Sequence, residues 1–428
     1  MQNKKTKIAV AGIGNVGSEV LNILKNQDDY WQLHAGFEIV AVSSRTTKAN
    51  IPSGAIFYND PLLMIAETDA EIIVELIGGV EIAKAIAIAT IKAKKHLVTA
   101  NKALLALCGN ELADLATKNF VNIGFEASVG GSIPIINTLK HSLVANKISK
   151  IIAIVNGTCN YILSQMFASG ASFTDALNRA KDLGFAEADP TADIDGIDSA
   201  HKLTLLATLA MKQKPCFVPE NITGITKITD IQMNLAKDLG YCIKLIATIE
   251  DLNGQIVYNV SPALVSSDSL MAKVVDATNI IAVLTNNCGW QYFVGAGAGG
   301  LATATAVIAD LVQIASQKSY NIVKPAFGLT TDNLKNSSFI KIDNSSLDYF
   351  FMANVVANYR KDQEIGLFDV IFSKELPIEK IVISEDAKTN SLFCGAIIKN
   401  SSASYIKEQI LANNPILIDY QLLPIFHC

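Results

Sequence analysis

The chain has 428 residues, half of them hydrophobic and 18% charged, with a formal net charge of −5. This length suits about two or three domains with buried cores, and the composition excludes general disorder. The acidic balance, without a Lys/Arg cluster, argues against a nucleic-acid surface. No segment has the roughly 20 uninterrupted apolar residues of a membrane span. Seven widely spaced Cys without a CxxC motif favour a reducing, cytoplasmic compartment over a disulfide framework or a Cys-based zinc site.

The N-terminal part alternates short apolar runs with helical patterns. The apolar strands lack polar alternation, which is typical of a parallel sheet covered on both faces. We therefore predict an α/β protein whose first domain, residues 1–130, is a doubly wound Rossmann sheet. Strands are expected at 7–11, 38–43, 71–76, 96–99 and 121–124, with helices at 15–26, 61–67, 81–95 and 109–119.

Two further domains are expected. Residues 131–330 read as a central α+β domain, with strands at 150–155, 255–260 and 292–294 and helical patterns from 133 to 211. A polar stretch at 332–346 is expected to be a linker. Residues 347–428 have the order β-α-β-β-α-β, which predicts a ferredoxin-like module. Its strands are expected at 349–355, 378–383, 391–399 and 416–422, and its helices at 364–372 and 403–413.

A glycine-rich loop, Gly12-Ile13-Gly14-Asn15-Val16-Gly17, joins the first expected strand to the first expected helix. In this context Gly12 permits a tight turn, Gly14 lets the backbone approach a pyrophosphate, and Gly17 lets the helix pack on the strand. Free N–H groups at the helix start attract the anion. The loop predicts a dinucleotide site; an ordinary strand–turn–helix junction is the alternative.

The second expected strand ends in Ser43-Ser44-Arg45, with Lys48 close behind. NAD-binding sites usually carry an acidic residue here, which would repel the 2′-phosphate of NADP. Hydroxyl groups and Arg45 would attract that phosphate, so we predict NADP as cofactor, or use of both NADP and NAD. A solvated loop arginine is the alternative.

Two more loops follow strand ends. Gly78 and Gly79 come after the strand at 71–76, and Asn101-Lys102 follows the strand that ends at Thr99. Open α/β sheets bind ligands beyond the carboxyl ends of their strands. Lys102 would place a cation beside cofactor and substrate, unless it is a surface lysine at a helix start.

The segment 184–202 contains five acidic residues, Glu187, Asp189, Asp193, Asp195 and Asp198, and leads into an apolar helix. Asp198 and Lys202 are four residues apart and would share a helix face. One interpretation takes the acids as helix caps with one surface ion pair. A second is a calcium loop, although the twelve-residue spacing of such a loop is absent. The third interpretation is a pocket for a zwitterion, in which a carboxylate holds an ammonium group and a lysine handles a proton.

This acidic segment resembles the signature of the homoserine dehydrogenases without a departure. Three shorter stretches resemble family elements in the same order: Asn101-Lys102, the run NGTCNYIL at 156–163, and the glycine-rich segment 295–299 before Thr303 and Asp310. The similarity covers residues 7–317, and the C-terminal module resembles an ACT domain. The signature residues are Ala180, Gly184, Phe185, Ala186, Asp189, Pro190, Asp193, Ile194, Gly196, Asp198 and Lys202.

The resemblance implies NAD(P)-dependent interconversion of L-homoserine and L-aspartate 4-semialdehyde, on the route to threonine and methionine. It makes Lys202 the general acid/base, assisted by Asp198, with Lys102 stabilising the oxygen or sharing the proton relay. The implied substrate contacts are Glu187, Asp193, Gly157 and Thr158. The cofactor contacts expected from the loops and the resemblance are Gly12, Gly14, Asn15, Val16, Gly17, Arg45, Gly78, Thr99, Lys102 and Gly299.

The resemblance also implies a monovalent cation, sodium or potassium, held by Glu126 and the carbonyl oxygens of Val129, Gly131 and Ile133. It implies a homodimer or homotetramer built through the central domain. An amino-acid effector such as threonine would bind the ACT-like module, where the loop 360–367 only loosely matches the effector turn. A purely structural role for this module is the alternative.

Two other functions stay open at this point. An aspartate-semialdehyde-type dehydrogenase needs an activated thiolate, and none of the seven Cys has an obvious His partner. A non-catalytic nucleotide and amino-acid sensor would not need Glu187, Asp198 and Lys202 together.

Overall fold

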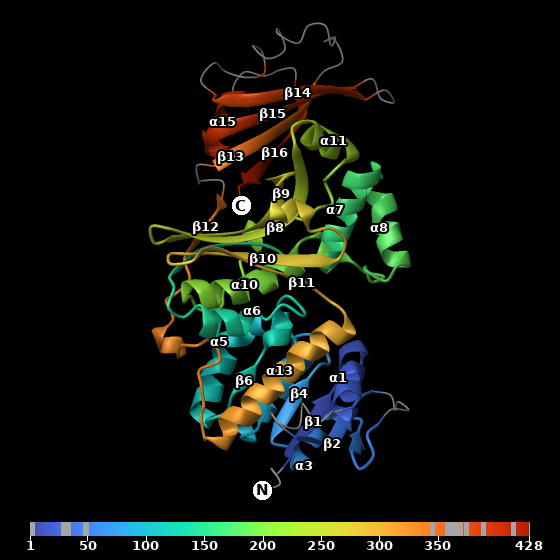
Figure 1. Ribbon diagram of the computed structural model, residues 1–428, viewed down its shortest axis with the longest axis vertical. Coiled ribbons are helices and arrows are strands. Elements are labelled where there is room, and N and C mark those ends of the chain that lie inside the picture. Colours follow the sequence, from blue (N-terminus) through green and yellow to red (C-terminus); the bar gives the residue numbers. More distant parts are fainter. Residues whose placement is uncertain are drawn as a thin grey trace. The chain divides into compact units, whose positions relative to one another are not determined.

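The computed structural model describes residues 5–26, 36–45, 51–342, 347–355, 371, 376–386, 391–411 and 417–427 (Figure 1). The chain forms two compact units, each made of several segments. The first comprises residues 1–149, 201–217 and 283–337, and the second 150–200, 218–282 and 338–428. The division into three domains at 1–130, 131–330 and 347–428 stays a prediction.

The first unit contains a six-stranded parallel sheet in the order β3-β2-β1-β4-β5-β6, with each neighbouring pair parallel. This is a doubly wound order, with its switch point between β1 and β4. The predicted Rossmann sheet is therefore confirmed. The strands are β1 (Thr6–Ala11), β2 (Phe37–Ser43), β3 (Ile56–Tyr58), β4 (Ile72–Glu75), β5 (His96–Thr99) and β6 (Ile123–Gly124), and the helices between them are α1 (Asn15–Lys25), α3 (Pro61–Glu67), α4 (Glu81–Lys92) and α5 (Lys102–Asn119).

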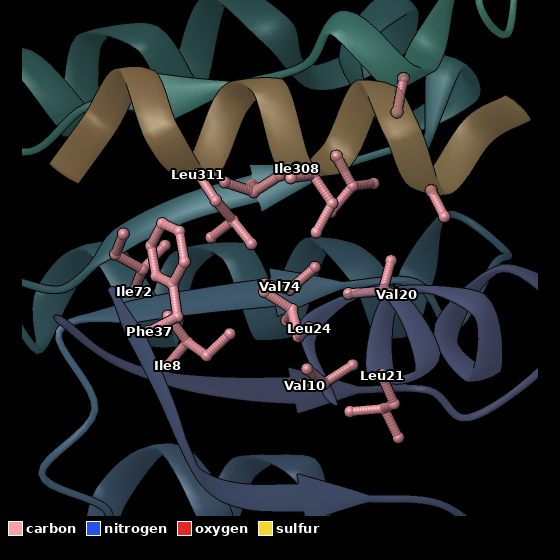
Figure 2. Packing of buried hydrophobic residues seen from close by; sticks show 14 of the residues in the cluster. Ile8, Val10, Val20, Leu21, Leu24, Phe37, Ile72, Val74, Ile308 and Leu311 are labelled. Carbon is pink, nitrogen blue, oxygen red and sulfur yellow. The ribbon is translucent and has the colours of Figure 1, made fainter. Parts of the chain in front are cut away.

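A helix from much later in the chain, α13 (Gly300–Ser319), covers one face of this sheet. Figure 2 shows Ile308 and Leu311 on the sheet-facing side of α13, directed toward Val74 and its neighbours, with Val20 and Leu24 of α1 in the same cluster. All five side chains are buried. Because each such side chain contributes about 1.5–3 kcal/mol when buried, α13 is integral to the dinucleotide-binding fold.

The expected helix at 109–119 began too late, because the helix starts at Lys102. The reason is a local cap: the Asn101 side chain accepts a hydrogen bond from the Leu104 amide at 2.9 Å. An asparagine in this position satisfies an amide that otherwise has no partner in the first turn. Lys102 is consequently the first residue of α5.

The second unit has a mixed sheet with helices against it, so the predicted α+β character is confirmed. Its strand order is β10-β7-β8-β9-β16-β13-β15-β14, and β12 (Phe339–Ile340), inside the expected linker 332–346, pairs with β9. The strands are β7 (Ile148–Ile154), β8 (Tyr241–Leu252), β9 (Gln255–Ser266), β10 (Thr278–Thr285), β13 (Leu347–Val355), β14 (Ile378–Asp386), β15 (Ser391–Ser401) and β16 (Leu417–Phe426). The helices are α7 (Gly157–Ser169), α8 (Phe173–Asp182), α9 (Thr191–Ile194), α10 (Ile197–Met211, which continues into the first unit), α11 (Asp230–Asp238), α12 (Leu270–Lys273) and α15 (Ala403–Leu411).

The C-terminal strands have the order β16-β13-β15-β14, with all three neighbouring pairs antiparallel. A β-α-β-β-α-β module of the ferredoxin-like kind gives this order. Its second helix is α15, whereas the expected helix at 364–372 lies, except for residue 371, outside the described residues. The assignment as an ACT-like module stays a prediction.

Within the described ranges, every helix is too short or too polar to cross a lipid bilayer. None of the six Cys in these ranges forms a disulfide.

Candidate active site

The turn from β1 to α1 requires its glycines. Gly12 has a φ of 101°, and a Cβ there would lie 2.6 Å from the Leu76 carbonyl oxygen. A Cβ at Gly17 would overlap the Gly12 carbonyl oxygen, whereas a Cβ at Gly14 would meet no atom within 4 Å. Gly14 therefore faces open space beside the amides at the start of α1. This arrangement fits a pyrophosphate group.

A cavity of about 660 Å³ lies beside this turn, in the volume range of small-molecule sites. Ser43, Ser44 and Arg45 line it together with Gly12 and Gly14, and no acidic residue is among its described lining residues. Ser43 is fully buried, and within the described part of the chain its hydroxyl has no hydrogen-bond partner. Lys48 lies outside the described residues. The lining provides hydroxyl groups and one cation for a ribose or its phosphate.

A second cavity, of about 290 Å³, collects residues from three separate loops. Val16 comes from the glycine-rich turn, Gly78 and Gly79 from the loop after β4, and Lys102 from the start of α5. The fold thus brings together loops that the sequence analysis treated separately, because the carboxyl ends of adjacent parallel strands meet at one edge of the sheet.

Glu75, at the end of β4, was missed by the sequence analysis. It is fully buried and lines the smaller cavity; its carboxylate accepts hydrogen bonds from the Thr99 hydroxyl at 2.7 Å and the Ile77 amide at 2.8 Å. Burial raises the pKa of Glu75, although these hydrogen bonds oppose the increase. The Asn101 amide donates to Thr99 Oγ1, and its side chain donates to the Gly79 carbonyl at 2.6 Å. The sequence did contain an indication of this role, because Glu75 is a charged residue at the end of an otherwise apolar strand.

The acid-rich turn is organised by another residue that the sequence analysis did not single out. Asn156 caps α7, and its Nδ2 donates to Asp193 Oδ1 at 2.7 Å and to Asp198 Oδ2 at 2.8 Å. Its Oδ1 accepts from the Cys159 amide at 2.8 Å. Two predicted acids, from α9 and α10, therefore meet the helix start that carries Gly157 and Thr158.

Lys202 is buried and lies one turn beyond Asp198 in α10, so the predicted common helix face is present. The Thr158 hydroxyl donates to the Phe185 carbonyl at 2.6 Å. Glu187 is exposed at the surface of the second unit. Asp189 Oδ1 accepts from the amide of Thr191, the first residue of the short helix α9, at 3.1 Å.

The late glycine-rich segment lies against the glycine-rich turn. Gly299, with a φ of 117°, precedes α13, and a Cβ at Gly300 would lie 3.1 Å from the Asn15 carbonyl oxygen. This close approach of two backbones explains the glycine at 300. It also places Gly299 near Asn15, both of which are predicted cofactor contacts.

The loop expected to hold a cation contains buried oxygen atoms. The Glu126 carboxylate accepts from the amides of Ile136 and Asn137, both at 2.8 Å, and the Glu126 amide donates to Asp310 at 2.8 Å. Burial raises the pKa of Asp310 to about 8 and also raises the pKa of Glu126. A Cβ at Gly131 would lie 2.6 Å from the Ala296 carbonyl oxygen.

The described residues contain no group of three His, Cys, Asp or Glu side chains suited to a metal. The donors that the resemblance implies, one carboxylate and three backbone carbonyls, are all oxygen atoms, the donor type that a hard, weakly held cation prefers.

A doubly wound sheet, a glycine-rich turn at its switch point and a buried lysine next to a carboxylate cluster define the class: a dinucleotide-dependent oxidoreductase. Residues 12–126 match the family model described as homoserine dehydrogenase, NAD binding domain, and residues 134–312 match the model described as homoserine dehydrogenase. The chain belongs to the homoserine dehydrogenase family. This assignment favours the main interpretation over the sensor and aspartate-semialdehyde alternatives.

Individual relatives agree with the family models. The homoserine dehydrogenase of Helicobacter pylori is 42% identical over 318 residues, which are 74% of this chain and 75% of the relative. The crystal structure of a homoserine dehydrogenase from Thiobacillus denitrificans has a TM-score of 0.88 at 30% identity, covering 99% of this chain and 98% of that one. A hyperthermophilic archaeal homoserine dehydrogenase mutant in complex with NADPH has a TM-score of 0.62 at 27% identity, covering 74% and 98% of the two chains.

Proposed function

We propose that Lys202 is the general acid/base of L-homoserine oxidation and of the reverse reduction of L-aspartate 4-semialdehyde. The observation that carries this proposal is the start of α10, where Asp198 is held by Asn156 and the buried Lys202 follows one turn later. When bound, the nicotinamide cofactor supplies the hydride acceptor or donor. Lys202 takes the hydroxyl proton of homoserine as the carbonyl forms, and Asp198 stabilises its ammonium form.

The predicted cofactor contacts fit a dinucleotide. Gly14 and the amides at the start of α1 receive the pyrophosphate, and Ser43 and Arg45 face the ribose end, where either cofactor is accepted and NADP is favoured. At the other end, Val16, Gly78 and Lys102 line the smaller cavity. Lys102 stabilises the substrate oxygen or shares the proton relay there, and Thr99 holds this loop through Glu75.

The amino-acid end of the substrate would be held by Asp193, Gly157 and Thr158, which the second unit gathers at the start of α7. A Cβ at Gly157 would lie 2.9 Å from the Ala277 carbonyl oxygen, so any larger residue would displace this backbone. Glu187 is exposed and available to bind the substrate ammonium group. A carboxylate that meets an ammonium ion forms a charge-assisted hydrogen bond.

Glu126 and the carbonyl oxygens of Val129, Gly131 and Ile133 would hold sodium or potassium. The carboxylate is already fixed by two amides, which leaves its other lone pairs for a cation. Replacing sodium and potassium chloride by choline chloride at constant ionic strength should lower activity. Equal activity in all three salts would remove the cation from the proposal.

An amino-acid effector such as threonine would have a cavity available in the second unit. A cavity of about 710 Å³ is lined by residues of α11, β9, β13 and β16, among them Asn259, Asn354 and Gln421. The buried Asn354 Oδ1 has no hydrogen-bond partner within the described part of the chain. The loop 360–367 lies outside the described residues. If the addition of threonine leaves turnover unchanged, threonine is not an effector and the C-terminal module has a structural role.

The assembly proposed from the resemblance is a homodimer or homotetramer. Light scattering coupled to size-exclusion chromatography measures it directly, and a monomeric mass would overturn it.

The proposed activity is tested by mixing purified protein with L-homoserine and either NADP or NAD, and following reduced cofactor. Turnover with at least one cofactor is expected, together with loss of turnover in Lys202→Ala. No homoserine-dependent reduction of either cofactor would overturn the assignment.

A further inference from the structure

We propose that Asn156 is a positioning residue that clamps Asp193 and Asp198 together, so that the acid-rich turn and the start of α7 present one fixed surface to the substrate. This inference rests on the proposed function, because it concerns the acids assigned there. It adds a residue to which the family resemblance gave no role.

The geometry shows why both acids depend on one side chain. Asn156 Nδ2 is 2.7 Å from Asp193 Oδ1 and 2.8 Å from Asp198 Oδ2. Because both oxygens accept from the same nitrogen, the distance between them is at most the sum of these two hydrogen-bond lengths. Asn156 and Asp198 are both buried, so water does little to screen the repulsion between the carboxylates.

An asparagine is suited to this position because its amide nitrogen carries two hydrogens and its oxygen is an acceptor. Both hydrogens go to carboxylates, and the oxygen accepts from the Cys159 amide at 2.8 Å. One side chain therefore caps α7 and offsets the repulsion between two acids. The Cys159 thiol, which donates to the Asp193 carbonyl at 3.1 Å, ties α7 to the same turn.

Replacing Asn156 by aspartate should keep the helix cap and remove the hydrogen bonds to Asp193 and Asp198. Aspartate has nearly the same shape and is also a good helix cap, so the bond from the Cys159 amide is kept. It has no donor, however, and adds a third negative charge between Asp193 and Asp198. Asn156→Ala removes both the cap and the clamp.

The matched control is Asn221→Ala, which removes another buried asparagine of the second unit. Asn221 Nδ2 donates to the Tyr258 carbonyl at 3.1 Å, and no carboxylate is involved. This variant loses a buried hydrogen bond without changing the environment of the two acids.

Kinetics provide the first readout. In Asn156→Asp and Asn156→Ala, kcat/KM for homoserine should fall about 10- to 100-fold, the range expected for lost hydrogen bonds to charged groups. The KM for the cofactor should stay within twofold, and the acid limb of the pH–rate profile should move to higher pH. Three titratable groups that are close to the pair in sequence or contact, Asp195, Lys202 and the Cys159 thiol, are retained in both variants.

Thermal unfolding provides a readout that does not need turnover. Both Asn156 variants should lose more stability relative to wild type at pH 7.5 than at pH 3, which is below the ordinary pKa of an aspartate, because protonated carboxyl groups do not repel each other. Asn221→Ala should lose the same amount at both values and keep its kcat/KM. If wild type does not oxidise homoserine, the proposed function fails while unfolding still tests the clamp. A loss in Asn156→Ala that is equal at both pH values, with kcat/KM within twofold of wild type, would reduce Asn156 to a helix cap.

Discussion

The Glu75 carboxylate accepts a 2.7 Å hydrogen bond from the Thr99 hydroxyl, and these two residues are register partners on the adjacent parallel strands β4 and β5. The bond connects the ends of two strands at the edge of the sheet where the glycine-rich turn lies. Through Thr99 it also reaches the Asn101 amide at 3.0 Å, immediately before Lys102. A buried acid thus fixes the backbone from which a proposed catalytic lysine emerges.

Replacing Glu75 by glutamine should change how stability depends on pH. Burial raises the pKa of Glu75 in the folded state. The favourable contribution of Glu75 to stability is therefore present at pH values below its pKa in the unfolded chain, and it is lost as the pH rises through the higher pKa of the folded state. Glutamine does not titrate. The Tm of Glu75→Gln should therefore rise relative to the Tm of wild type between pH 4.5 and pH 8, as measured by calorimetry.

Glu81→Gln, at an exposed position in the first turn of α4, is the control and should show no such trend. Glu75→Ala should cost about 2–3 kcal/mol at pH 4.5, because the Ile77 amide and the Thr99 hydroxyl both lose their acceptor, and this cost should decrease as pH rises, since alanine does not titrate either. A Tm difference for Glu75→Gln that is constant with pH would contradict the assigned burial effect.

Lys202→Ala should lower kcat by about 10²- to 10⁴-fold, which is the usual contribution of a general acid/base. Steady-state kinetics with homoserine measure this, and fluorescence titration of the reduced cofactor should show binding unchanged. Lys212→Ala is the control, since Lys212 is exposed just after the same helix and should leave turnover intact. Turnover in Lys202→Ala within tenfold of wild type would assign the proton step to another group, with Lys102 as the next candidate.

Arg45→Ala should raise the KM for NADP about tenfold or more and leave that for NAD within about twofold, because a lost bond to a charged phosphate costs about 1.5–3 kcal/mol. Arg45 lines the cavity beside the glycine-rich turn together with Ser43. Arg179→Ala on α8 removes a guanidinium far along the chain and serves as the control. Equal effects of Arg45→Ala on the KM values for both cofactors would show that Arg45 does not bind the 2′-phosphate of NADP.

Asp348→Asn should destabilise the C-terminal strands by about 1 kcal/mol at pH 7, because its partners are partly exposed. Although burial raises the pKa of Asp348, hydrogen bonds from Lys399 at 2.7 Å, the Asn400 amide at 3.0 Å and His427 at 2.8 Å outweigh it and lower the pKa.

A group whose pKa is lowered by folding stabilises the protein at pH values above its pKa in the unfolded chain. This stabilisation is lost as the pH falls through its pKa in the folded state. The stability difference between wild type and Asp348→Asn should consequently shrink between pH 5 and 2.5 in thermal unfolding. Asp268→Asn, at an exposed position after β9, should show little difference at any pH. An Asp348→Asn difference that persists at pH 2.5 would show that packing, and not charge, is lost.

The local features of this protein could be predicted from the sequence because their causes are local. Apolar runs without alternation identified the parallel strands, and the spacing of Gly12, Gly14 and Gly17 identified the turn that needs them. The four-residue interval from Asp198 to Lys202 placed both on one helix face. Helix α5 was predicted too short because the cap at Asn101 was not recognised, and the strands β8 and β10 were missed.

The tertiary structure alone decided which distant residues meet. Nothing near Glu75 in the sequence indicates Thr99, and nothing near Asn156 indicates a bond to both Asp193 and Asp198. Likewise, α13 packs on a sheet whose last strand ends well over a hundred residues earlier. The sequence encodes each residue's local preference, but hydrogen bonds between distant residues depend on the register of strands and the packing of helices, which are fixed only when the whole core is buried.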